Sequence, residues 1–152
     1  MQLRKVNPKI EDVKMDENEQ LKNVIRQWSW EIMKRLELPL IEIEFNFLYP
    51  NCTYKQNENF LLYGLKFLKE FKDINRYAEA VPPMKFFDRL YFIVAHETAH
   101  YLQKYRYPRW FGKYFEEWRT NVVDINSHVR QKLERNASRI ASILLKEYKN
   151  KT

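Results

Sequence analysis

The chain has 152 residues, of which 45% are hydrophobic and 16% aromatic, and this is enough for a single domain with a packed core. Its one cysteine, Cys52, excludes an internal disulfide framework and favours a reducing, cytoplasmic setting. No apolar run is long enough to span a membrane, and the first twenty residues lack the apolar segment of a signal peptide.

The first predicted element is a long amphipathic helix. Residues 1–15 are expected to form a polar lead-in, and Asp16 with Glu19 forms a capping-box pattern. Apolar residues then recur at helical spacing until Pro39, which ends the run. The sequence therefore predicts a helix between Asp16 and Pro39.

A small sheet is predicted next. The segment "IEIEFNF" (41–47) alternates apolar and polar residues, as a half-buried strand does, and a turn follows at Pro50–Asn51. Residues 60–68 fit a strand or a short helix, and residues 76–81 fit a strand or the approach to the next helix. These elements favour an α+β fold with a short mixed or antiparallel sheet of about three strands.

Two helices are predicted in the second half of the chain. The first begins between Pro83 and a cap at Asp88, and it runs to Pro108. The second begins near Lys113 beyond a connection that contains Gly112, and it continues to about residue 149, with a break near Asn136 as one option. Residues 129–152 hold seven Lys and Arg against two Glu, so residues 130–152 are expected to form a basic C-terminal helix.

The segment "IVAHETAHYL" (93–102) contains two of the three histidines in the chain. On a helix, His96 and His100 project from the same face and can direct a ring nitrogen at one ion. Glu97 lies one position round the helix, where a carboxylate can act as general base toward a water on that ion. Two histidines and a glutamate in an otherwise apolar helix are costly to bury, and a zinc ion compensates that cost. The alternative is a pair of hydrogen-bonded core histidines beside an incidental glutamate.

A catalytic zinc needs a third protein ligand and one open position. Within residues 115–129, an apolar stripe at helical spacing is flanked by a polar stripe that Glu117 leads. Glu117 is therefore the predicted third metal ligand, with Glu116 and His128 as alternatives.

"HETAH" (96–100) followed by "EWRTN" (117–121) resembles the gluzincin pattern of zinc metallopeptidases, in particular the minigluzincins and the ImmA/IrrE-like peptidases. The resemblance covers roughly residues 88–128. It implies a single zincin-like domain over residues 1–152, a Zn²⁺ cofactor, and a sheet whose edge strand aligns an extended peptide substrate. It also implies that Asn121 orients a zinc-binding histidine.

The predicted function is a zinc-dependent metallopeptidase that hydrolyses peptide bonds with Glu97 as its catalytic base. The alternative is a non-hydrolytic protein stabilised by zinc, which binds nucleic acid or a protein partner through its basic C-terminal helix. A DNA-associated peptidase of the SprT kind would join both ideas, but that group has a third histidine after the motif. The residue that would stabilise the transition state is left open among Tyr54, Tyr77, Tyr101 and Tyr105.

Overall fold

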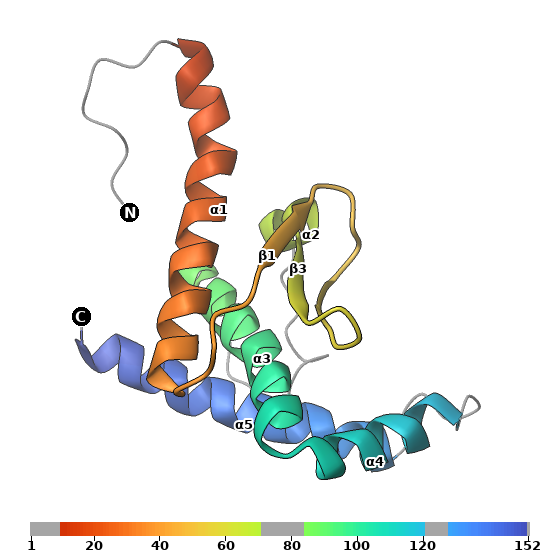
Figure 1. Cartoon of the computed structure of the whole chain (residues 1–152). Helices are drawn as coiled ribbons and strands as arrows, with labels where there is room; N and C mark the ends of the chain where they lie inside the picture. The colour runs from red at the N-terminus through yellow and green to blue at the C-terminus, as the bar shows by residue number, and fades with distance from the viewer. Residues whose placement is uncertain (1–9, 71–83, 121–127, 152) are drawn as a thin grey trace.

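The structure is a computed structural model that describes residues 10–70, 84–120 and 128–151 (Figure 1). Five helices and a three-stranded mixed sheet confirm the predicted α+β class. In chain order the elements are α1 (Ile10–Arg35), β1 (Ile43–Asn46), β2 (Cys52–Lys55), β3 (Phe60–Gly64), α2 (Leu65–Glu70), α3 (Phe86–Arg106), α4 (Pro108–Thr120) and α5 (His128–Lys151).

Helix α1 begins earlier than the sequence predicts. It starts at Ile10, so the second part of the expected polar lead-in is helical and Asp16 is not its cap. The helix ends as predicted before Pro39. Glu37 takes a left-handed conformation (φ 57°), and the N–H of Leu38 donates to the carbonyl of Met33 at 2.8 Å.

The sheet has the strand order β1-β3-β2, so β1 and β2 are its two outer strands. Strand β1 pairs with β3 in parallel and confirms the strand predicted from residues 41–47. Strand β2 pairs with β3 antiparallel and was not predicted individually. Both readings of residues 60–68 are partly right, because β3 occupies Phe60–Gly64 and α2 follows at Leu65. Residues 76–81 lie outside the described part of the chain.

The single long helix predicted from Lys113 to residue 149 is wrong. Helix α4 begins at Pro108 and includes Gly112, and a separate helix, α5, begins at His128 and passes Asn136 without a break. Helices α4 and α5 pack against each other, so the chain turns back between them (Figure 1). Proline is well tolerated in the first turn of a helix, which explains why Pro108 starts α4.

Helix α3 lies at the centre of the molecule. It packs against α1, α4, α5 and the outer strand β2 (Figure 1). Every residue from Leu90 to Ala99 is buried, so this stretch meets neighbouring elements on all sides. The N-cap of α3 is Lys85, and Asp88 lies in the first turn instead of capping the helix as predicted. The motif at residues 96–100 is therefore carried by a helix that the rest of the fold encloses.

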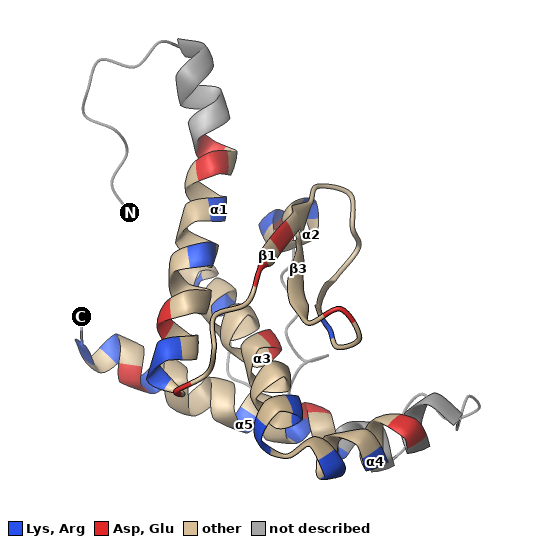
Figure 2. Ribbon diagram, viewed as in Figure 1, with Lys and Arg blue, Asp and Glu red and all other residues tan. Residues whose placement is uncertain are grey.

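The basic C-terminal helix is confirmed as a helix, and it is part of the core. Leu133, Ala137, Ala141, Leu144 and Leu145 of α5 are buried. Its charged residues are mostly basic, as the blue segments along its ribbon in Figure 2 show. Two of them form ion pairs with other elements at 3.0 Å, Glu147 with Arg35 and Lys149 with Asp88. These contacts fix α5 against α1 and α3.

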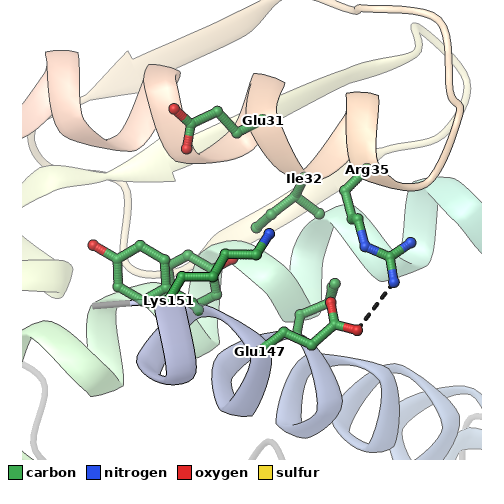
Figure 3. Close-up of a pocket in the computed structure, with 8 residues that line it drawn as sticks. Glu31, Ile32, Arg35, Glu147 and Lys151 are labelled. Carbon is green, nitrogen blue, oxygen red and sulfur yellow. Dashed lines mark hydrogen bonds and ion pairs between the residues drawn. The ribbon is translucent and has the colours of Figure 1, made fainter.

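A cavity of about 190 Å³ lies where α1, α3 and α5 meet (Figure 3). Tyr91 and Tyr148 stack in its wall with ring centroids 4.3 Å apart, and the Arg35–Glu147 ion pair lies beside it. None of the residues that line this cavity belongs to the motif at residues 96–100.

None of the helices in the described ranges is both long and apolar enough to cross a membrane.

The two glycines give a test of the sheet geometry. A Cβ added at Gly64 would lie 2.0 Å from the carbonyl oxygen of Tyr49 and 2.7 Å from that of Asn51, whereas a Cβ at Gly112 would meet nothing within 4 Å. We expect Gly64→Ala to lower the free energy of unfolding by about 2 kcal/mol or more, because backbone atoms must move. Gly112→Ala should raise it by about 0.5–1 kcal/mol, since alanine favours the helix.

Denaturant unfolding of the two variants measures both effects. If the Gly64→Ala variant is as stable as the unmodified protein, the β1–β2 connection does not pass as close to β3 as the structure shows.

Candidate metal site

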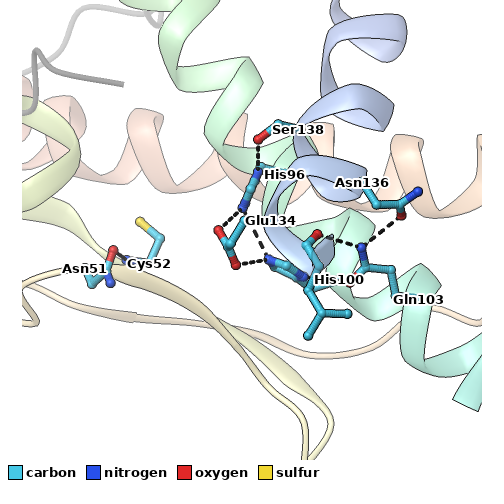
Figure 4. A network of polar contacts seen from close by, with 9 residues as sticks. Asn51, Cys52, His96, His100, Gln103, Glu134, Asn136 and Ser138 are labelled. Atoms are coloured by element: carbon cyan, nitrogen blue, oxygen red, sulfur yellow. Dashed lines mark hydrogen bonds and ion pairs between the residues drawn. The ribbon is translucent and has the colours of Figure 1, made fainter. Parts of the chain in front are cut away.

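Helix α3 places the two histidines of the motif on the same face. His96 is fully buried and the His100 side chain is 13% exposed. Their Nε2 atoms lie 3.2 Å apart, and the two rings are nearly perpendicular at 87°. The predicted convergence of two ring nitrogens is therefore present in the structure (Figure 4).

A carboxylate from α5 completes the cluster. One oxygen of Glu134 lies 3.0 Å from Nε2 of His96, and the other lies 3.0 Å from Nε2 of His100. Figure 4 shows the carboxylate beside the two rings with one oxygen toward each, and Asn51 and Cys52 lie on the sheet side of the cluster. His96, His100 and Glu134 form the one group of three potential metal ligands found in the described ranges, with donor atoms within 4.8 Å of one another.

The spacing of these donors suits a tetrahedral ion such as zinc. Zinc binds imidazole nitrogen and carboxylate oxygen at about 2.0–2.2 Å, which keeps neighbouring ligands of a tetrahedron roughly 3.3 Å apart. The separations of 3.0 and 3.2 Å are slightly shorter, so a small outward movement of the side chains would admit the ion. Two nitrogens and one oxygen from three residues also form the donor set typical of catalytic zinc, which leaves a fourth position for water.

The charges of the three groups depend strongly on one another. Burial lowers the pKa of His96, and the hydrogen bond to Glu134 only partly offsets this. Burial also acts to lower the pKa of His100, but the charge of Glu134 outweighs it and raises the value to about 9. Burial acts to raise the pKa of Glu134, but His100 holds it well below its usual value. Without an ion, His100 therefore carries a proton in the place that a metal would take.

Gln103 fixes the orientation of the His100 ring. Its amide nitrogen donates to the carbonyl of Leu133 at 3.0 Å and to Oδ1 of Asn136 at 2.9 Å. Because the Leu133 carbonyl can only accept, the amide oxygen of Gln103 must face Nδ1 of His100, 2.8 Å away. An amide oxygen can only accept as well, so Nδ1 carries the hydrogen. In a neutral ring this leaves the lone pair on Nε2, toward the cluster.

Ser138 performs the corresponding role for His96. Its hydroxyl lies 3.1 Å from Nδ1 of His96, and it is 4% exposed. Ser138 stands one helical turn after Glu134, so α5 supplies both the carboxylate and a partner for the opposite side of the ring. Such partners orient metal-binding histidines and set their tautomer.

Glu97, the predicted general base, is 4% exposed. Its charge contributes to raising the pKa of His100 and of Tyr63, a buried residue of β3. Glu97 therefore acts electrostatically on both the cluster and the adjacent sheet.

Glu134 is the site residue that the sequence analysis missed. Glu117, the predicted ligand, lies on α4 with its side chain outside the described residues, and it stays a prediction. The same holds for Asn121, which lies outside them entirely, and for His128, the first residue of α5. The alternative Glu116 is exposed on α4.

One signal could have found Glu134. In the gluzincin pattern a small residue follows the ligand glutamate at the third position, and Glu134 is followed there by Ala137. At the fourth position it has Ser138 in place of Asn or Asp. Glu117 has Thr120 and Asn121 at these positions, but the sequence analysis chose Glu117 because it leads the polar stripe within residues 115–129.

Two of the tyrosines considered for transition-state stabilisation have structural hydrogen bonds. The hydroxyl of Tyr101 donates to the carbonyl of Pro39 at 2.8 Å, and that of Tyr54 donates to Oδ1 of Asn59 at 2.5 Å. Tyr105 is 53% exposed, and Tyr77 lies outside the described residues. The geometry thus singles out none of the three described tyrosines.

Comparison of the chain with protein-family models, with curated proteins and with solved structures gives no match. The interpretation of the site therefore rests on its own geometry.

The third ligand can be tested by substitution. Glu134→Gln should weaken zinc binding by at least tenfold, because it replaces the charged donor of the cluster, and Glu116→Gln on the surface of α4 should leave binding unchanged. Competition with a chromophoric chelator measures both affinities. If Glu117→Gln weakens binding and Glu134→Gln does not, the donor set of the structure is wrong.

Gln103 allows a test of the ring orientation. Gln103→Leu should weaken zinc binding by about 10–100-fold, as expected when a partner of a metal-binding histidine is removed. Gln103→Glu keeps an acceptor for Nδ1 of His100 but loses the donor to Leu133. It should therefore retain more of the zinc affinity than the leucine variant while lowering thermal stability. Equal zinc affinity in the leucine variant and the unmodified protein would show that Gln103 has only a packing role.

Proposed function

We propose that the protein is a zinc-dependent metallopeptidase in which His96, His100 and Glu134 hold the ion and Glu97 is the general base. The observation that carries the proposal is the convergence of two histidines from α3 and one carboxylate from α5, with donor atoms within 4.8 Å. Glutamate at position 97 adds a base directly beside the first of these histidines. The proposal retains the gluzincin resemblance and substitutes Glu134 for Glu117 as the third ligand.

Zinc bound by these donors would supply an acidified water and polarise the scissile carbonyl. Glu97 would take the proton of the attacking water and return it to the leaving amine. Its burial at 4% exposure restricts competition from bulk solvent. Gln103 and Ser138 would hold the two rings with Nε2 directed at the ion.

Strand β2 is the outer strand next to α3, and it offers an edge for an extended substrate. Within the described sheet it pairs only with β3, so its other edge can add a peptide strand through backbone hydrogen bonds. The side chain of Glu134 is 30% exposed, whereas that of His96 is not exposed. A peptide substrate along β2 would therefore reach the cluster from the side of Glu134.

Substitution of Glu97 tests the proposal. Glu97→Gln removes the base and keeps all three ligands, so it should reduce peptide hydrolysis by about 100-fold to 10,000-fold at unchanged zinc content. Cleavage of a fluorogenic peptide library, with zinc measured by elemental analysis of the same samples, gives both values. Glu116→Gln on the surface of α4 is the matched control and should keep full activity.

Two results would reject the proposal. If the Glu97→Gln variant loses its zinc, Glu97 is a ligand and the assigned roles are wrong. If the unmodified protein holds one zinc per chain and cleaves nothing in the library, the ion has a structural role.

A further inference from the structure

A second functional surface lies where α3 ends and α4 begins. The segment "KYRYPRWFGKY" (104–114) contains four Lys and Arg, five aromatic residues and no acidic residue. We call the surface formed by this segment and by Lys132 of α5 the α3–α4 corner. Its charge of +4 within 104–114 compares with +7 for the whole chain, so basic residues are concentrated here.

The tyrosines at the corner are exposed to an unusual degree. Tyr105 is 53% exposed and Tyr107 is 59% exposed, although both belong to a residue type that is usually half-buried. They flank Arg106, the last residue of α3, and Pro108 begins α4 directly afterwards. The abrupt change of helix therefore presents their rings to solvent.

Basic residues accompany the rings on α4. Arg109 and Lys113 are both exposed and lie four positions apart, so they share one face of the helix. The ammonium group of Lys132 lies 3.2 Å from the hydroxyl of Tyr114 and 4.9 Å from the centre of its ring. Blue segments gather where α3 meets α4 in Figure 2.

The cations at the corner differ from Lys149 of α5 in their acidic neighbours. In the described parts of the chain, no ion pair joins Arg109, Lys113 or Lys132 to a carboxylate. Lys149 of α5, in contrast, is paired with Asp88. Cations that no carboxylate of the described ranges pairs with retain their attraction for an external polyanion.

We propose that the α3–α4 corner binds single-stranded nucleic acid. Arg109, Lys113 and Lys132 provide contacts for successive phosphates, and Tyr105 and Tyr107 provide faces on which unpaired bases stack. Stacking of this kind needs bases released from a duplex, which is why single strands are favoured over duplexes. The basic-tail hypothesis placed such binding on the whole of residues 130–152. The structure favours the corner, which takes only Lys132 from that segment, because the apolar face of α5 is packed into the core.

Two pairs of substitutions separate the ionic and stacking contributions. Binding of fluorescein-labelled oligothymidine and oligouridine of about 20 nucleotides is measured by fluorescence polarisation between 50 and 200 mM salt. Arg109→Gln with Lys113→Gln should weaken binding and reduce the slope of log K against log salt by about 1.4, the value for two phosphate contacts on a single strand. Tyr105→Ala with Tyr107→Ala should weaken binding at least tenfold with little change in that slope.

Arg139→Gln with Lys146→Gln is the matched control, because it removes the same charge from exposed positions of α5. This variant should retain the full salt dependence apart from a small general loss of affinity. Zinc content and thermal unfolding of all variants should equal those of the unmodified protein, since every substituted residue is exposed.

Several outcomes would overturn the proposal. One is the absence of binding at 50 mM salt, and another is equal binding of the duplex form of the same sequence. A third is loss of binding in the α5 control but not in the corner variants, which would place the contact on α5. Binding to anionic phospholipid vesicles but not to oligonucleotides would identify the corner as a membrane-surface site.

Discussion

The contact between α3 and α5 is the interaction on which the rest of the structure depends. Helix α3 is buried along most of its length and carries two histidines and a glutamate into the interior. Buried polar groups need partners, since an unpaired one costs about 1–3 kcal/mol. Helix α5 supplies partners for the two histidines: the carboxylate of Glu134 contacts both rings, and Ser138 contacts the opposite nitrogen of His96. The same face of α5 buries apolar residues against α3, so packing and polar pairing hold the two helices together.

This arrangement links the candidate metal site to folding. The histidines and Glu134 are more than thirty positions apart in the chain, and only the packed helices bring them together. An ion bound there would cross-link α3 and α5, and its binding free energy would add to the stability of the fold. In the absence of an ion, the raised pKa of His100 and the lowered pKa of Glu134 indicate that a proton maintains the same contact. The cluster is thus compatible with a folded protein in both states.

The sequence was sufficient for the parts of the fold that depend on local pattern. The alternation in residues 41–47 predicted β1, and the spacing of His96 and His100 predicted that their ring nitrogens converge. Both are properties of one element. Which carboxylate joins the two histidines depends on how α3, α4 and α5 pack. The helical stripe that led to Glu117 assumed one continuous helix beyond Lys113. A helical stripe locates a buried face, but it does not tell which turn of that face meets another helix.

Gln103 shows how such packing information enters the chemistry. In the sequence it is one of several polar residues after the motif, and nothing there marks it as more than a surface side chain. In the structure it is 1% exposed and bonded at both ends of its amide, to His100 through the oxygen and to α5 through the nitrogen. Because the amide cannot exchange its donor and acceptor ends, the position of α5 determines which nitrogen of His100 carries the hydrogen. The direction of the Nε2 lone pair on a neutral His100 ring therefore follows from the packing of α5 against α3.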